Sequence, residues 1–138
     1  MLTPVDLQQQ RILITGATGF VAEPIIRALS KNNTVFAAAR FNKPEDKTKV
    51  ENLGAEAITV DLSNLNFNEL PNVDYVINLA VVKSGKWPVD LAVNAESVGH
   101  LMQRYQDVKG FLHISSTAVY EAAGDVLLDE HASLGDNH

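Results

Sequence analysis

The stretch Arg11-Ile-Leu-Ile-Thr-Gly-Ala-Thr-Gly-Phe-Val-Ala-Glu-Pro-Ile-Ile-Arg27 predicts a short apolar strand, a glycine turn and the beginning of a helix. Gly16 and Gly19 allow the backbone to turn tightly and to approach a ligand with no side chain in between. The following helix directs free N–H groups and the positive end of its dipole toward that turn. This geometry suits an anion, most often a nucleotide pyrophosphate. A glycine turn by itself is weak evidence, so its meaning depends on the sequence around it.

Strand and helix signals alternate along the rest of the chain. Apolar runs predict strands at residues 35–39, 57–60, 74–80 and 110–115. Helices are expected after the glycine turn, over residues 43–53, and from Pro88 onward, where the predicted apolar stripe comprises Leu91, Ala95, Val98, Met102 and Tyr105. This alternation predicts an α/β fold, a doubly wound parallel sheet of Rossmann type with strand order 3-2-1-4-5 and helices on both faces. A ligand is then expected beyond the carboxyl ends of the strands.

Composition and charge narrow the class of protein. A length of 138 residues suits one domain, and the absence of cysteine excludes disulfides and thiolate metal sites. The net charge of −6 includes five acids and no lysine or arginine over residues 121–138, which we interpret as a solvated acidic tail rather than an interaction tail. No basic stripe predicts nucleic-acid binding, and no apolar run is long enough to span a membrane. We therefore expect a soluble, cytoplasmic protein.

Motifs in a fixed order carry a resemblance to a known family. Thr15-Gly-Ala-Thr-Gly-Phe-Val-Ala22 resembles the cofactor-binding turn of the extended short-chain dehydrogenase/reductase family, which includes NAD(P)-dependent sugar-nucleotide epimerases and dehydratases. The resemblance runs from Arg11 to Tyr120, almost the whole chain. Asp61-Leu62, Asn78-Leu-Ala80 and Ser115-Ser116 resemble later motifs of that family, each at the end of a predicted strand.

The resemblance implies a set of site residues. Those expected to bind the cofactor are Gly16, Thr18, Gly19, Phe20, Val21, Arg40, Asp61, Leu62, Leu79, Ala80, Val81 and Ser115, with Ser116 as the catalytic residue and no metal. Asp61 would accept a hydrogen bond from the adenine amino group, although an aspartate at a strand end also caps turns. Asn94 matches a family asparagine and fits a structural role equally well.

Arg40 bears on the choice of cofactor. An NAD site usually has an acid about 20 residues after the glycine motif, bonded to the ribose 2′-hydroxyl. No acid occurs in Val35-Phe-Ala-Ala-Ala-Arg40, whereas the guanidinium of Arg40 suits a 2′-phosphate. We therefore predict NADP, with NAD as the alternative cofactor. A solvent-exposed arginine at a strand end is the competing interpretation.

Two residues of the helix after the glycine turn depart from the family pattern. Glu23 adds negative charge near the expected pyrophosphate, and Pro24 removes a backbone donor and could distort the helix. Both changes predict weaker cofactor binding. They also motivate a third hypothesis, a scaffold that binds no nucleotide.

The family's Tyr-x-x-x-Lys pair is not found after Ser116. Tyr105-Gln-Asp-Val-Lys109 has the spacing but precedes the fifth strand, and its tyrosine extends the apolar stripe, so we expect a core residue. The resemblance implies a single cofactor-binding domain over residues 1–138, cut before the catalytic pair and the substrate lobe. The leading hypothesis is an enzyme acting on a hydroxyl or keto group of a sugar nucleotide or similar small molecule. The alternative is a non-catalytic NADP-binding sensor or interaction module.

Two further expectations concern association and the histidines. An unpaired edge on the fifth strand would invite a second copy, so we expect a homodimer or marginal stability. The four histidines have no ligand-like spacing, and we expect His113 and the others to be structural or exposed.

Overall fold

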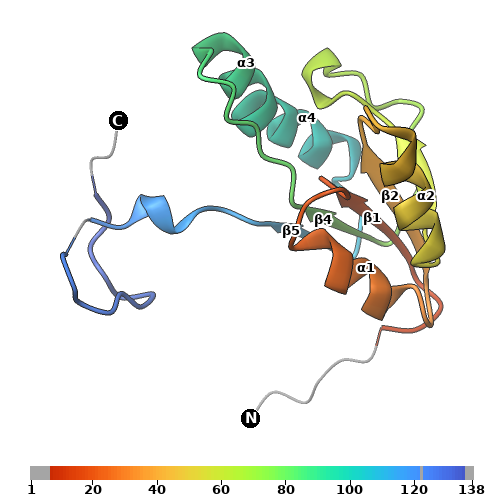
Figure 1. Ribbon diagram of the computed structural model, residues 1–138, viewed down its shortest axis with the longest axis horizontal. Coiled ribbons are helices and arrows are strands. Elements are labelled where there is room, and N and C mark those ends of the chain that lie inside the picture. The colour runs from red at the N-terminus through yellow and green to blue at the C-terminus, as the bar shows by residue number, and fades with distance from the viewer. Residues whose placement is uncertain (1–6, 122, 136–138) are drawn as a thin grey trace.

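The computed structural model describes residues 7–121 and 123–135 of the chain. In this part of the chain five strands form one sheet in the order β3-β2-β1-β4-β5 (Figure 1), with all neighbouring strands parallel. The strands are β1 (Arg11–Thr15), β2 (Thr34–Ala39), β3 (Glu56–Thr59), β4 (Tyr75–Asn78) and β5 (Gly110–His113). The predicted Rossmann-type sheet and its strand order are confirmed.

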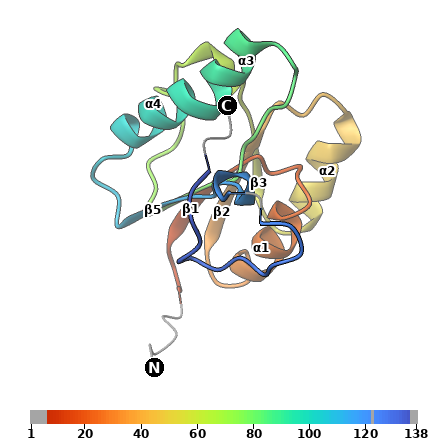
Figure 2. The same ribbon diagram turned by 90° about the vertical axis from the view of Figure 1, so that its left-hand side faces the viewer.

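Helices cover both faces of this sheet, as the alternating pattern predicts. Figures 1 and 2 show α1 (Ala22–Leu29) and α2 (Pro44–Asn52) on one face. The other face carries α3 (Trp87–Leu91), the π-helical turn η2 (Ala92–Glu96) and α4 (Ser97–Arg104), which follow one another without a break. Two short 3₁₀ turns, η1 (Leu62–Asn64) and η3 (Thr117–Val119), follow β3 and β5.

Alternating side chains of the central strand β1 supply both cores. Ile12 and Ile14 pack into the cluster under α1 and α2, whereas Leu13 packs into the cluster under α4. All three side chains are completely buried. A strand buried on both faces reads as a continuous apolar run, which is why the sequence of β1 is so easily recognised.

The apolar stripe predicted for the long helix is wrong in register except at Tyr105, which is buried as predicted. Leu91, Ala95 and Met102 are exposed and Val98 is half-buried. The residues that face the sheet recur at every fourth position instead, and these are Val93, Ser97, Leu101 and Tyr105. A π turn holds more residues than an α-helical turn, so η2 rotates the buried face away from the position that a period of 3.6 predicts.

Tyr105 is a core residue, as expected. Its side chain is 3% exposed, and its hydroxyl donates a hydrogen bond of 2.9 Å to the carbonyl oxygen of Pro71. Burial raises the pKa of this phenol above its ordinary value. Tyr105 therefore has neither the access nor the acidity that proton transfer to a substrate requires.

The chain beyond β5 leaves the body of the domain (Figure 1). Tyr120 and Leu134 form an isolated antiparallel bridge, and the described carboxylates of residues 121–135 are exposed. Asp136, the last acid of the predicted tail, lies outside the described residues.

Candidate dinucleotide site

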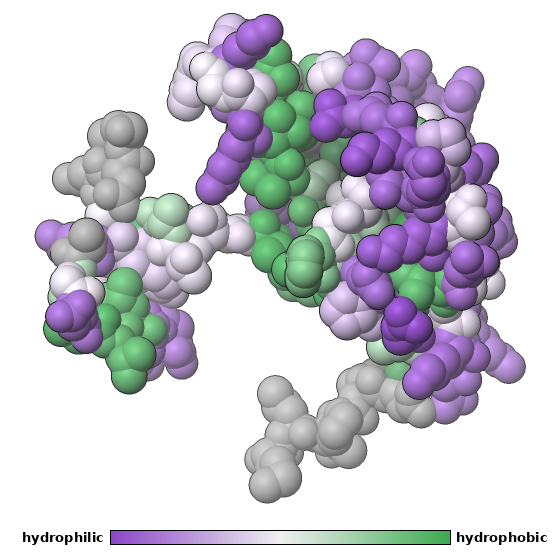
Figure 3. Space-filling view, viewed as in Figure 1, coloured by the Kyte–Doolittle hydropathy of each residue, from purple (hydrophilic) through white to green (hydrophobic). Residues whose placement is uncertain are grey.

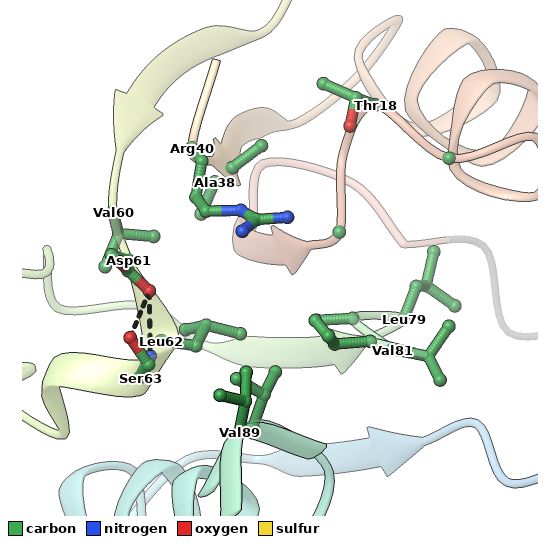
Figure 4. Close-up of a pocket in the computed structure, with 16 residues that line it drawn as sticks. Thr18, Ala38, Arg40, Val60, Asp61, Leu62, Ser63, Leu79, Val81 and Val89 are labelled. Carbon is green, nitrogen blue, oxygen red and sulfur yellow. Dashed lines mark hydrogen bonds between the residues drawn. The ribbon is translucent and has the colours of Figure 1, made fainter. Parts of the chain in front are cut away.

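A hollow of about 240 Å³ lies where the carboxyl ends of β1, β2 and β4 meet the segment after β3. It is lined by Gly16, Thr18, Gly19, Ala38, Ala39, Arg40, Val60, Asp61, Leu62, Ser63, Leu79, Ala80, Val81, Val82, Val89 and Val93. Figure 4 shows polar groups on one side of this pocket and the apolar side chains of Leu62, Val89 and Val81 on the other. A mostly apolar wall with a few polar groups is the usual composition of a cofactor pocket.

The glycine turn approaches the end of β4 too closely for any side chain. Gly16 has a φ of +67°, and a Cβ atom placed on it would lie 2.8 Å from the backbone nitrogen of Ala80. The turn closes with a hydrogen bond of 3.0 Å from the Gly19 N–H to the Gly16 carbonyl oxygen. The turn leads into α1, where the Ala22 N–H donates a hydrogen bond of 3.2 Å to the Gly19 carbonyl oxygen.

Arg40 follows β2 directly, and its guanidinium extends into the space between Asp61 and Thr18 (Figure 4). Phe41, the next residue, has a φ of +47° and packs against the cluster under α1 and α2. The chain therefore turns sharply after Arg40, burying the aromatic ring on one side of the sheet while the arginine stays at the pocket.

Asp61 already accepts hydrogen bonds at one oxygen. Its Oδ1 accepts from the Ser63 backbone N–H at 3.0 Å and from the Ser63 hydroxyl at 2.7 Å. These bonds to Ser63, and then the charge of Arg40, hold the pKa of Asp61 below its ordinary value. The capping role considered from the sequence is therefore present, and Oδ2 remains as a second acceptor at the pocket.

Pro24 does not distort the helix as the sequence suggested, and the charge of Glu23 is paired with neighbouring cations. Glu23 forms ion pairs with Lys49 at 2.7 Å and Arg27 at 3.1 Å, which lower the pKa of its carboxyl and offset its charge. Pro24 occupies the third position of α1, where the missing N–H has no intrahelical partner in any case. The helix continues regularly to Leu29.

Two side chains of the helix after β4 hold the loop at the pocket. Asn94 accepts a hydrogen bond of 2.8 Å from the Val82 N–H and donates one of 2.7 Å to the Val82 carbonyl oxygen. Asp90 accepts from the backbone N–H of Ser84 at 2.8 Å and from its hydroxyl at 2.7 Å. Asn94 thus has a structural role, one of the two interpretations that the sequence left open.

The structure brings most of the predicted cofactor residues together, but not all of them. Nine line the pocket, namely Gly16, Thr18, Gly19, Arg40, Asp61, Leu62, Leu79, Ala80 and Val81. Phe20 and Val21 do not, and their side chains are 101% and 59% exposed. Ser115 and Ser116 also lie outside the lining, and the Ser116 hydroxyl oxygen caps η3 by accepting the Ala118 N–H at 3.1 Å.

Other lining residues were missed from the sequence. They are Ala38, Ala39, Val60, Ser63, Val82, Val89 and Val93. Most of them are sequence neighbours of predicted residues at the carboxyl ends of strands. Including the residues just before and just after each predicted strand end would have found them. Val89 and Val93 come from the helix, and the π turn that aims Val93 gives no sequence signal.

The pocket opens onto an apolar surface. Figure 3 shows a hydrophobic band that runs from α3 toward the start of α1. Exposed apolar side chains in these segments and the loop between them are Phe20, Val21, Val81, Trp87, Val89 and Leu91. Within the described residues, no group of three histidines or acids could hold a metal ion, and no helix is long and apolar enough to cross a membrane.

Comparison with known protein families gives a match over nearly the whole chain. Residues 12–137 match the family described as the NAD dependent epimerase/dehydratase family. A comparison with curated protein sequences gave no match.

Solved structures of similar fold include epimerases and reductases. UDP-glucuronic acid 4-epimerase from Bacillus cereus, in complex with NAD, is 26% identical over 84% of this chain and 43% of that chain, with a TM-score of 0.68. The enzyme WbmG from Bordetella bronchiseptica, in complex with NAD, is 18% identical over 93% of this chain and 44% of that chain, with a TM-score of 0.75. A candidate 2-deoxy-d-gluconate 3-dehydrogenase from Agrobacterium tumefaciens, with bound NADP, is 18% identical over 85% of this chain and 57% of that chain, with a TM-score of 0.69. The present chain thus spans between 43% and 57% of the length of these structures.

Proposed function

The chain belongs to the NAD-dependent epimerase/dehydratase family, and from the position of Arg40 we propose that its pocket binds NADP in preference to NAD. The proposal extends to the activity: the chain forms the dinucleotide-binding part of an enzyme acting on a hydroxyl or keto group of a sugar nucleotide or similar small molecule. The observation that carries it is the pocket itself, which combines the side-chain-free cradle at Gly16 with Arg40 and Asp61 at the ends of neighbouring strands.

Each part of the pocket suits one part of the dinucleotide. The glycine turn and the positive end of the α1 dipole suit the pyrophosphate. Asp61 retains one oxygen for the adenine amino group, and Leu62 offers an apolar surface to the ring. The guanidinium of Arg40 suits a 2′-phosphate, because it is planar and permanently charged.

The nicotinamide of a bound dinucleotide would supply hydride transfer, and the protein supplies binding and orientation. Leu79, Ala80 and Val81 form the apolar wall opposite the glycine turn, where they would keep water from the reacting ring. We assign Ser116 to the substrate oxygen on the strength of the motif, and Ser115, Phe20 and Val21 to the edge of the cofactor site. UDP-glucuronic acid is the first substrate to test, because it is the substrate named for the Bacillus cereus relative.

A non-catalytic NADP-binding sensor is the second candidate, and two observations favour it for the 138 residues taken by themselves. The segment with Ser116 leads away from the pocket. The Tyr-x-x-x-Lys spacing occurs in this sequence only at Tyr105 and Lys109, and Tyr105 is buried.

Calorimetric titration with NADPH and with NADH tests the proposal. We expect both to bind and NADPH to bind at least about fivefold more tightly, because one charge-assisted contact is worth that much or more. Tighter binding of NADH would overturn the NADP preference, and no binding of either would favour a scaffold without nucleotide. Two outcomes would support catalysis by this chain: net formation of reduced nicotinamide from NADP and UDP-glucuronic acid, followed by its absorbance, or conversion of UDP-glucuronic acid to an epimer, in which the cofactor is reduced and reoxidised within one turnover, followed by chromatography. Binding without turnover of any sugar nucleotide would support the sensor. The homodimer and the cytoplasmic location stay predictions.

A further inference from the structure

Three polar side chains lie next to one another across three strands, immediately before the pocket. Thr15, Asn78 and His113 are the last residues of β1, β4 and β5, and the strand register places Thr15 opposite Asn78 and Asn78 opposite His113. The Thr15 hydroxyl donates a hydrogen bond to Oδ1 of Asn78, and Nδ2 of Asn78 lies 3.0 Å from Nδ1 of His113. Thr15 is 0% exposed and Asn78 is 1% exposed, so this pair depends on protein partners rather than water.

The donors and acceptors of this row indicate which hydrogen-bonding role Nδ1 of His113 has. Because Oδ1 of Asn78 accepts from Thr15, its amide nitrogen faces the imidazole, and an amide nitrogen can only donate. In this arrangement Nδ1 of His113 is the acceptor of the hydrogen bond. Turning the Asn78 amide around would leave the buried Thr15 hydroxyl without an acceptor for its proton.

The row directly precedes the two backbone segments that would hold the pyrophosphate. Gly16 follows Thr15 and Leu79 follows Asn78, and both Gly16 and Leu79 line the pocket. These segments already touch: the Leu79 N–H donates to the Thr15 carbonyl oxygen at 3.3 Å, and a Cβ on Gly16 would lie 2.8 Å from the Leu79 carbonyl carbon. A small shift between the ends of β1 and β4 would therefore change the cradle directly.

We propose that His113, which lies outside the pocket lining, is a positioning residue for the pyrophosphate end of the dinucleotide. Its imidazole orients the Asn78 amide, which orients Thr15, and the row keeps the glycine turn in register with the end of β4. This inference rests on the proposed function of the pocket. The adenosine end of the site, with Arg40 and Asp61, belongs to the ends of β2 and β3 and is not part of this row.

Two ligands separate positioning from a general loss of structure. NADPH uses both ends of the site, whereas adenosine 2′-monophosphate uses only the end with Arg40 and Asp61. His113→Phe keeps a ring but removes the acceptor, and we expect it to weaken NADPH binding about fivefold to tenfold while leaving adenosine 2′-monophosphate unchanged, as the loss of one partly buried hydrogen bond implies. His113→Asn places its Oδ1 where Nδ1 lies in the wild type, and we expect it to restore NADPH binding.

His100→Phe on α4 is the matched control, since His100 is an exposed histidine on another element, and we expect wild-type binding of both ligands. Thermal unfolding of each variant shows whether it is folded. If the larger ring of His113→Phe prevents folding, His113→Leu takes its place. The inference is overturned if the variant without an acceptor binds NADPH like the wild type, if both ligands weaken in the same proportion, or if His113→Asn does not rescue. Wild-type protein that binds neither ligand would overturn the proposed function, and this inference with it.

Discussion

Gly16 and Ala80 are 64 positions apart in the sequence, yet their backbones are in contact, since a Cβ on Gly16 would lie 2.8 Å from the Ala80 nitrogen and 2.9 Å from its Cα. The glycine turn is therefore required by the β4 segment whether or not a ligand is bound. This contact joins the fold to the site, because the same absence of a side chain that lets β4 pack also opens the cradle.

Gly16→Ala should damage folding and binding together. The new methyl group meets backbone atoms that cannot move aside, and a φ of +67° is unfavourable for alanine. We expect the free energy of unfolding to fall by about 2 kcal/mol or more. Gly99→Ala is the control, because a Cβ there meets nothing within 4 Å and lies in a helix; it should raise the free energy of unfolding by about 0.5–1 kcal/mol in a urea titration. Equal behaviour of the two variants would contradict the close contact.

Arg40→Ala should change the cofactor preference rather than stability. NADPH binding should weaken about tenfold or more, because a charge-assisted contact to the 2′-phosphate is lost. NADH carries no such phosphate, so its affinity should stay within about twofold. Lys43→Ala, which removes an equal charge just before α2, should leave both affinities unchanged. A loss of NADH binding in Arg40→Ala would assign the arginine a different role.

Asn94→Ala should loosen the loop that forms one wall of the pocket. It removes two hydrogen bonds to Val82, for an expected loss of about 1–2 kcal/mol in the free energy of unfolding. Asn94→Asp should be no better, although its shape is similar, because one carboxylate oxygen would face the Val82 carbonyl oxygen. Both variants should weaken NADPH binding, whereas Gln103→Ala at an exposed position of α4 should not. Wild-type stability and NADPH binding in Asn94→Asp would contradict the role of the two hydrogen bonds to Val82.

The hydrogen bonds of Asp74 predict that the free energy of unfolding depends on pH in the acid range. At the amino ends of the strands its Oδ2 accepts the Arg11 N–H at 2.8 Å, and its Oδ1 lies 3.0 Å from Nζ of Lys109. The bond from Arg11, and then that from Lys109, lower the pKa of the Asp74 carboxyl below the ordinary value of 3.8. A lowered pKa stabilises the fold above the ordinary pKa, and this stabilisation is lost as the pH falls through the lowered one.

Asp74→Asn should therefore be less stable than the wild type near neutral pH, and the difference should shrink once the pH falls well below 3.8. Thermal unfolding across that range measures it. Asp107→Asn, in the turn before β5, removes the same charge and should not reproduce the pattern. A constant difference between wild type and Asp74→Asn at all pH values would show that the carboxylate does not act through these bonds.

The edge strand β5 predicts self-association. It pairs with β4 and, within residues 7–121 and 123–135, with no other strand. Leu112 is 53% exposed and Ile114 is 46% exposed, and the register of Leu112 with Ile77 places it on the face of α1. We expect dimers or larger species by light scattering, with Leu112→Lys shifting the protein to monomer. Met102→Lys on α4 is the control, since Met102 is also 53% exposed. A wild-type monomer, or equal effects of the two lysines, would contradict the prediction.

The part of this site that could be predicted from the sequence lies at the carboxyl ends of recognisable strands. Gly16, Arg40, Asp61 and Leu79 each stand beside a recognisable buried strand, and parallel strands bring their carboxyl ends to one edge. The position of these residues at the ends of parallel strands is therefore enough to predict that they lie close together.

The failures have a different cause. The buried face of the long helix depends on the π turn, and no pattern of 3.6 residues reports it. Phe67 and Leu70 complete the core from an irregular segment without periodicity, so no element was predicted there. His113 read as an ordinary strand residue, because its role depends on two neighbours in the sheet that are distant in sequence.

The central position of β1 has a consequence for synthesis of the chain on the ribosome. The glycine turn is made well before β4, and β2 can pair with β1 soon afterward. The opposite wall of the cradle, at Leu79 and Ala80, is translated more than 60 residues after Gly16. A nucleotide therefore has no complete site on the early nascent chain, and its binding energy can stabilise the domain only after β4 has inserted beside β1.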